Sequence, residues 1–132
     1  KVIDLAYDHI RDRFYLVESD ELRIHQNGDY LEDPDLPEDQ EGHPPVRSVA
    51  VDPNQPEFVY VAANRNTFKT SAGALFSPDA GVTWQNLNRT EPLSQGALDA
   101  GREPMWVRVN PVTSEAWFAT SCYGVWKWVQ PK

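Results

Sequence analysis

The stretch from Ser77 to Trp84 constrains this chain most, because it reads Ser-x-Asp-x-Gly-x-Thr-Trp between two apolar segments. The aspartate of such a turn accepts hydrogen bonds from nearby backbone N–H groups, and the glycine tolerates a positive φ angle. Threonine and tryptophan favour an extended strand on the return. We therefore expect a hairpin with a tight polar turn, in which Ala74–Phe76 is the incoming strand and Thr83–Leu87 the returning one.

Strand-like segments around this hairpin fall into three successive groups. An aspartate or asparagine ends the first strand of each group, at Asp8, Asp52 and Asn110, and a proline follows the last two. Asn27-Gly28 is a strong signal for a two-residue hairpin turn. The expected strands are Val2–Asp8, Phe14–Val17, Leu22–His25 and Asp29–Leu31; then Val46–Asp52, Phe58–Ala62, Ala74–Phe76 and Thr83–Leu87; then Trp106–Asn110, Ala116–Thr120 and Val125–Val129.

Repetition of one four-strand pattern is typical of β-propeller blades. The chain of 132 residues contains 11 prolines and 7 glycines, which favour many short strands over long helices. We predict an all-β fold of three antiparallel meanders, the last one incomplete, with a β-sandwich of about eleven strands as the alternative. The expected division is blade 1–32, acidic loop 33–45, blade 46–88, loop 89–104 and incomplete blade 105–132.

The second group resembles one blade of the Asp-box β-propellers, which are also described as BNR repeats. This group includes sialidases, family 74 glycoside hydrolases acting on xyloglucan, sortilin-type receptor domains and photosystem assembly factors. Val49–Pro53, Val59–Ala62 and Ser77–Trp84 look most like the xyloglucanase type of blade, and Thr120–Lys127 is similar to its closing strands. The resemblance implies structural roles in the turn for Ser77, Asp79, Gly81, Thr83 and Trp84.

Three blades are too few for a closed ring, because propellers have about four to eight. Strand edges would remain open at both ends of such a stack. We expect the residues to be the C-terminal part of a longer propeller, with the remaining blades supplied by upstream sequence. A six-bladed ring of two copies, with the remaining blades supplied by another chain, is the alternative.

The resemblance also implies where a ligand binds. In such propellers the ligand lies near the axis, on the face formed by the loops between strands two and three and between blades. The Asp-box lies on the opposite face. The loops expected on the ligand face are Glu18–Glu21, Glu32–Pro45, Ala63–Gly73, Asn88–Pro104 and Thr120–Tyr123.

Carboxylates on these loops are the candidate catalytic groups. A glycoside hydrolase needs two carboxyl groups about 5 to 10 Å apart, one to donate a proton and one to attack or to activate water. Asp99 and Glu103 share one loop and are the predicted catalytic pair, while Glu18 and Asp20 share another. The alternative is that each of them is a solvated loop carboxylate.

Tryptophans are the candidate glycan contacts, because an exposed indole can stack on a sugar ring. We assign this role to Trp106 and Trp126, with packing between blades as the alternative. A sialidase would also need clustered arginines to hold its substrate carboxylate. Arg47, Arg65, Arg102 and Arg108 are available, but no sialidase arrangement of them is recognisable.

Charge and composition exclude several partners. The formal net charge of −8 disfavours nucleic acid, and no apolar run is long enough to span a membrane. The scattered histidines and the lone Cys122 predict no metal, cofactor or internal disulfide. The resemblance implies a secreted or periplasmic propeller that binds or hydrolyses a glycan, acting as a glycoside hydrolase if it is catalytic. The alternative is a non-catalytic propeller that serves as a platform for protein interaction or assembly.

Overall fold

The computed structural model describes residues 1–38, 42–64, 73–87, 104–120 and 125–128. These residues form strands in three antiparallel sheets. The first sheet has the order β1-β2-β3-β4, with β1 at Val2–Asp8, β2 at Arg13–Glu18, β3 at Glu21–Gln26 and β4 at Asp29–Glu32. The second has the order β5-β6-β7-β8, with β5 at Val46–Val51, β6 at Val59–Ala63, β7 at Ala74–Ser77 and β8 at Gln85–Asn86. The third has the order β11-β10-β9, with β9 at Pro104–Val109, β10 at Ala116–Thr120 and β11 at Val125–Trp128.

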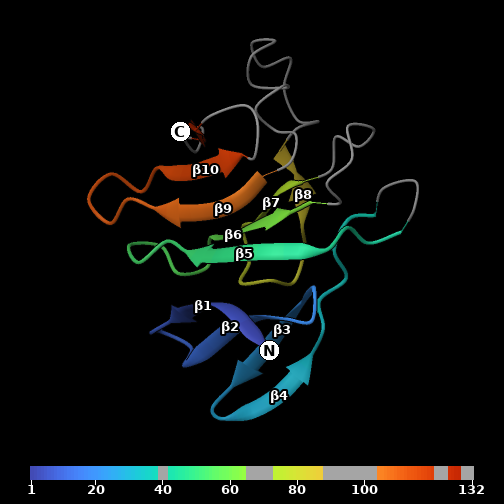
Figure 1. Cartoon of the computed structure of the whole chain (residues 1–132). Helices are drawn as coiled ribbons and strands as arrows, with labels where there is room; N and C mark the ends of the chain where they lie inside the picture. The colour runs from blue at the N-terminus through green and yellow to red at the C-terminus, as the bar shows by residue number, and fades with distance from the viewer. Residues whose placement is uncertain (39–41, 65–72, 88–103, 121–124, 129–132) are drawn as a thin grey trace.

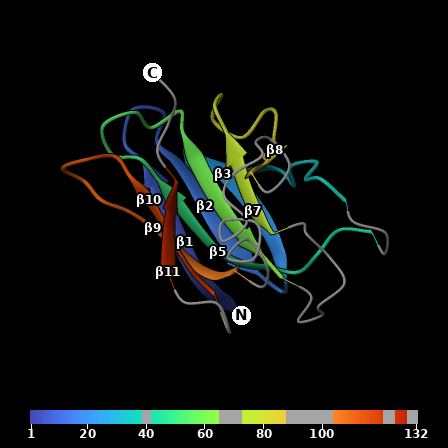
Figure 2. The same cartoon turned by 90° about the horizontal axis from the view of Figure 1, so that it is seen from above.

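The three sheets confirm the prediction of an all-β fold of three meanders, the last with three strands. The first strands β1, β5 and β9 lie next to one another, and the sheets follow in chain order from the bottom to the top of Figure 1. Seen from above, their strands cross the molecule in a similar diagonal direction (Figure 2). The alternative of a two-sheet sandwich is wrong, and the described residues do not close into a ring.

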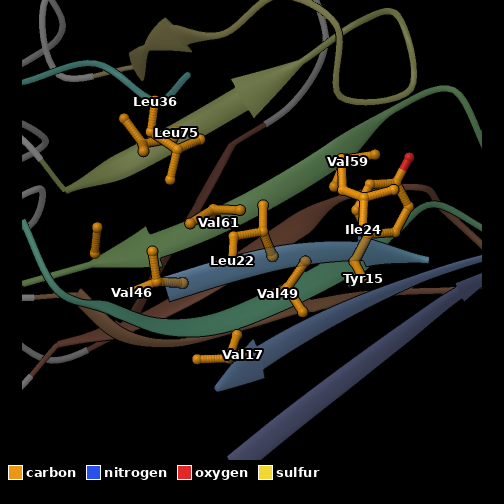
Figure 3. Packing of buried hydrophobic residues seen from close by; sticks show 11 residues of the cluster. Tyr15, Val17, Leu22, Ile24, Leu36, Val46, Val49, Val59, Val61 and Leu75 are labelled. Carbon is orange, nitrogen blue, oxygen red and sulfur yellow. The ribbon is translucent and has the colours of Figure 1, made fainter. Parts of the chain in front are cut away.

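The second sheet is covered on both faces, which explains why every residue of β6 is buried. Side chains of a strand alternate between the faces of its sheet. Val59 and Val61 accordingly pack with the first sheet, in the cluster that Figure 3 shows. Tyr60 and Ala62 belong to a second cluster, shared with the third sheet. The core is therefore two apolar layers between three sheets.

Each first strand ends in the same local structure, as the sequence predicts. The side-chain Oδ1 of Asp8 accepts a hydrogen bond from the N–H of Ile10, at 2.9 Å. Asp52 and Asn110 bind the N–H two residues ahead in the same way, each at 2.9 Å. An Asx side chain held in this manner turns the chain toward the second strand, so the three meanders are repeats of one unit.

Hydrogen bonds between turns define two ends of the stack. At one end, which we call the Asp-box end, the N–H of Asn27 binds the carbonyl oxygen of Asp12, and that of Ala80 binds the carbonyl oxygen of Glu57. At the opposite end, the N–H of Val46 binds the carbonyl oxygen of Asp20. The β2–β3 turn and the loop before β5 are thus on the end away from the Asp-box turn.

One predicted strand is much shorter than expected. The sequence predicts a returning strand from Thr83 to Leu87, whereas β8 contains only Gln85 and Asn86. The reason is that Thr83 is held in the turn by its hydrogen bonds to Asp79.

Candidate functional site

The Asp-box turn is organised around the Asp79 carboxylate. Its Oδ1 accepts the N–H of Thr83 at 2.8 Å, and its Oδ2 accepts the Thr83 hydroxyl at 2.6 Å. The Ser77 hydroxyl donates to Asp79 Oδ1 at 2.9 Å and accepts the N–H of Gly81 at 2.8 Å. The Trp84 indole N–H reaches back to the carbonyl oxygen of Gly81 at 3.0 Å. All five predicted residues therefore bond within one turn.

This turn also contacts the first sheet. The Arg13 guanidinium donates to the carbonyl oxygen of Ala80, and Gly81 lies against the side chains of Tyr15 and Ile24. Desolvation opposes ionisation of Asp79, but hydrogen bonds from Thr83 and Ser77 outweigh it and lower the pKa of the carboxyl group. An ionised aspartate with three internal donors suits a structural role better than proton transfer.

The opposite end of the stack contains a cavity of about 500 Å³ between the β2–β3 turn and the loop before β5. Carboxylates dominate its polar lining, which includes Asp20, Glu21, Asp33 and Asp35 together with His43. Both bordering segments belong to the predicted ligand-face loops Glu18–Glu21 and Glu32–Pro45. The structure therefore brings two of those loops together around one hollow, which we call the acidic cavity.

Local structure fixes both walls of the acidic cavity. Ser19 and Asp20 have φ angles of 52° and 65°, which is the two-residue turn that matches the twist of a hairpin. The Arg47 guanidinium donates to the Asp20 carboxylate at 3.3 Å and to the carbonyl oxygen of Asn64 at 3.3 Å. On the other wall, Leu36 is buried in the core cluster and anchors the acidic loop. The cavity is therefore built into the fold.

A second group of polar side chains joins the three first strands. The largely buried carboxylate of Asp4 on β1 accepts the hydroxyl of Ser48 on β5 at 2.6 Å. Arg108 on β9 donates to both Asp4 oxygens, at 3.0 and 3.2 Å. The N–H groups of Leu5 and Val49 complete the set, at 2.9 and 3.1 Å. We call Asp4, Ser48 and Arg108 the axial cluster, because it lies where the three sheets meet.

The axial cluster holds its aspartate ionised. Desolvation raises the pKa of Asp4, but hydrogen bonds from Ser48, Val49 and Arg108 more than compensate, and the net pKa lies below its ordinary value. A hollow of about 300 Å³ borders it, lined by Arg108 and by apolar residues of the three first strands. Arg108 is already paired with Asp4, so the cluster acts as a tie between sheets.

The predicted site residues have different outcomes. Asp99 and Glu103 lie outside the described residues, as does the side chain of Trp126. Of the second carboxylate pair, Asp20 lines the acidic cavity, whereas Glu18 is bound by Arg23 at 3.3 Å. Trp106 is 48 % exposed on a sheet face with Arg108 over its ring, and it does not line the acidic cavity.

The axial cluster is what sequence reasoning missed. Asp4 sits in a strand pattern that accounts for it as an ordinary alternating polar residue. Counting back from the strand-ending residues would have helped, because Asp4 and Ser48 both lie four positions before one, at Asp8 and Asp52. Nothing in the sequence pairs Asp4 with Arg108, which lies 104 residues away.

No protein-family model matches this chain, and a search of curated proteins finds no match either. Within the described residues, no group of three or more His, Cys, Asp and Glu side chains is placed to hold a metal ion. The described part of the chain contains no helix long and apolar enough to cross a membrane.

Proposed function

We propose that this chain supplies glycan-binding blades of a secreted or periplasmic Asp-box β-propeller. One observation carries the proposal: the acidic cavity lies at the end of the stack opposite the Asp-box turn, between two loops that the resemblance assigns to a ligand. Its volume of about 500 Å³ is in the range of small-molecule sites. The family resemblance to xyloglucanase-type blades supports the same ligand class.

The chemistry of the lining favours a neutral sugar. Four carboxylates can accept hydrogen bonds from sugar hydroxyls, while Leu36 and the neighbouring prolines offer apolar surface to the ring faces. Asp20 and Glu21 are paired with Arg47 and Arg23, so repulsion of acidic sugars such as sialic acid comes from Asp33 and Asp35. We therefore expect neutral oligosaccharides, such as xyloglucan fragments, as ligands. Hydrolysis, if it occurs, would need the predicted pair Asp99 and Glu103.

Calorimetric titration with neutral and acidic oligosaccharides tests this proposal. Asp33→Asn and Asp35→Asn each exchange a cavity carboxylate for an amide and should weaken binding about five- to tenfold, the value of about 1 to 1.4 kcal/mol for one ordinary hydrogen bond, because the amide keeps one acceptor oxygen. Asp29→Asn, at the first residue of β4 on the Asp-box end, is the matched control and should bind normally. Neutral-glycan affinity unchanged in both cavity variants would refute the site. The same samples, incubated with polysaccharide, report hydrolysis.

An assembly platform is the second candidate function. It is supported by two sheet faces that carry exposed apolar side chains, including Leu5 and Tyr7 on the first sheet and Trp106 and Trp117 on the third. Exposed apolar patches of this kind mark interaction surfaces. No response to any glycan, together with a stable protein complex, would favour this second function.

A further inference from the structure

The first strands of the three sheets each have one backbone edge that pairs with no strand of their own sheet. β1, β5 and β9 stand at the end of the strand order in their sheets, so each pairs along one edge only. The three strands also lie side by side (Figure 1). Successive residues of an antiparallel strand direct their N–H and C=O groups to opposite edges. Every second residue of each first strand therefore directs both groups away from its own sheet.

Hydrogen bonds at the strand-ending residues show which positions these are. The N–H of Asp52 binds the carbonyl oxygen of Phe58, on the side of β6, at 3.0 Å. The N–H of Asn110 binds the carbonyl oxygen of Glu115, on the side of β10, at 2.9 Å. The residues one and three positions before each strand-ending residue therefore direct their N–H and C=O groups to the unpaired edge.

The axial cluster satisfies the N–H groups three positions before the strand-ending residues. The Asp4 carboxylate accepts those of Leu5 and Val49, at 2.9 and 3.1 Å. The Ser48 hydroxyl accepts that of Val107, at 3.1 Å. One polar cluster thus binds the unpaired edge of all three first strands, which shows that these edges converge.

The backbone groups one position before the strand-ending residues have no equivalent of this cluster. They belong to Tyr7, Val51 and Val109, two residues further along the same edges. Within the part of the chain that the structure describes, no turn or loop backbone group binds their N–H or C=O. All three residues line the hollow of about 300 Å³ beside the axial cluster, which we call the axial hollow. It therefore contains three donors and three acceptors of the backbone that face it.

The chemistry of the axial hollow favours a neutral ligand. Arg108 is the one charged residue among the described residues that line it, and Asp4 already binds this guanidinium. The remaining side chains of the lining are mostly aliphatic, with Pro53 and Pro111 at the turns. A hydroxyl group both donates and accepts a hydrogen bond, as one N–H and C=O pair of a strand edge requires. A carboxylate would leave the carbonyl oxygens without a donor, and an ammonium would leave the N–H groups without an acceptor.

We propose that the axial hollow binds a neutral molecule with several hydroxyl groups, about the size of a single sugar ring. Its hydroxyls bind the backbone edges at Tyr7, Val51 and Val109, and its carbon skeleton contacts the apolar walls. The volume is at the lower end of the range of small-molecule sites. The turn after β5 belongs to the Asp-box end, so this site and the acidic cavity lie at different ends of the stack. The inference goes beyond binding at the acidic cavity and does not depend on it.

Titration with glucose, followed by nuclear magnetic resonance of the backbone amides, tests the proposal. The amide resonances of Tyr7, Val51 and Val109 should shift saturably, with a Kd on the order of 1 mM for so small a ligand. Acetate and methylammonium should cause no saturable shift at these amides. Pro111→Trp fills the hollow with an indole ring and should abolish the glucose shifts. Val112→Trp, at the next position, which is 86 % exposed and does not line the hollow, is the matched control and should bind glucose normally.

Three results would overturn the proposal. They are the absence of a saturable glucose shift at the three amides, retained glucose binding in folded Pro111→Trp, and saturable shifts with acetate, which would indicate an anion site. Thermal melts monitored by circular dichroism establish that each variant is folded, and Pro53→Trp, at the other turn of the hollow, replaces Pro111→Trp if it is not. Asp33→Asn changes the acidic cavity alone and should keep the glucose shifts. Oligosaccharide titration of the same samples reports the acidic cavity separately, so failure of one proposal does not imply failure of the other.

Discussion

Replacement of Gly81 by alanine tests how the Asp-box turn is attached to the rest of the stack. Gly81 has a φ angle of +88°, and a Cβ atom there would lie 3.3 Å from Cε1 of Tyr15 and 3.2 Å from Cδ1 of Ile24. Both side chains belong to the first sheet and to the buried core cluster. The substitution therefore perturbs the backbone of one sheet and its packing against another at once.

Two physical costs add up at this position. A left-handed backbone costs a non-glycine residue about 1 to 2 kcal/mol. Overpacking of a core adds about 1 to 3 kcal/mol. The end of the Ile24 side chain can rotate away, but the fully buried Tyr15 ring cannot. We therefore expect that side-chain movement does not remove the overpacking cost. The total is about 2 to 5 kcal/mol, a large fraction of the stability of a small domain.

Gly28→Ala is the matched control. Gly28 lies in the β3–β4 turn with a φ angle of +85°, yet no atom lies within 4 Å of the position that an alanine Cβ would take. The free energy of unfolding of this variant should fall by only about 1 to 2 kcal/mol, the cost of a left-handed backbone at alanine. Urea unfolding at one fixed protein concentration gives the free energy of unfolding of both variants. The dependence of that free energy on urea concentration should be the same as in the unsubstituted chain. Equal losses in the two variants would show that the turn does not pack on the first sheet.

Two further predictions concern the ionised aspartates. Asp79→Ala should lower the free energy of unfolding by about 1 kcal/mol, as loss of a capping side chain does. Glycan binding by this variant should survive. An unchanged melting temperature together with lost binding would reverse our assignment of the two ends. Asp4 has a lowered pKa, so its contribution to stability is present above its ordinary pKa of 3.8 and is lost as pH falls through the lower folded value. Asp4→Asn should therefore be less stable at pH 7 but lose less stability than the unsubstituted chain between about pH 5 and pH 2, measured by melting temperature.

The sequence predicts the strands well because local rules govern them. Alternation and strand-ending aspartates locate β1 without error, at Val2–Asp8. Asn27 and Gly28 adopt the positive φ angles expected of a two-residue turn, 53° and 85°. The Ser19-Asp20 turn has the same geometry without a glycine, so its conformation could not be anticipated from residue preferences alone.

Contacts between sheets are harder to predict, because they depend on packing between distant segments. The sequence offers Arg108 only as a candidate substrate-binding arginine, since its pairing with Asp4 depends on the relative placement of β1 and β9. The acidic cavity requires the loop before β5 to fold against the β2–β3 turn, through the bond between Val46 and Asp20. The resemblance assigns these loops to one face, but it does not reveal the hollow between them.

The Asp-box turn and the acidic cavity lie at opposite ends of this stack. At one end, Asp79 holds the Asp-box turn together, and Ala80 and Gly81 of that turn contact Arg13, Tyr15 and Ile24 of the first sheet. At the other end, Asp35 lines the acidic cavity without lying in a strand or in either core cluster. Leu22, Leu36 and Val46 of the cavity wall belong to the core cluster, but Asp33 and Asp35 are exposed, so these two carboxylates can change with little cost to the fold. Substitution of Asp33 or Asp35 should therefore leave the packing that joins the sheets unchanged.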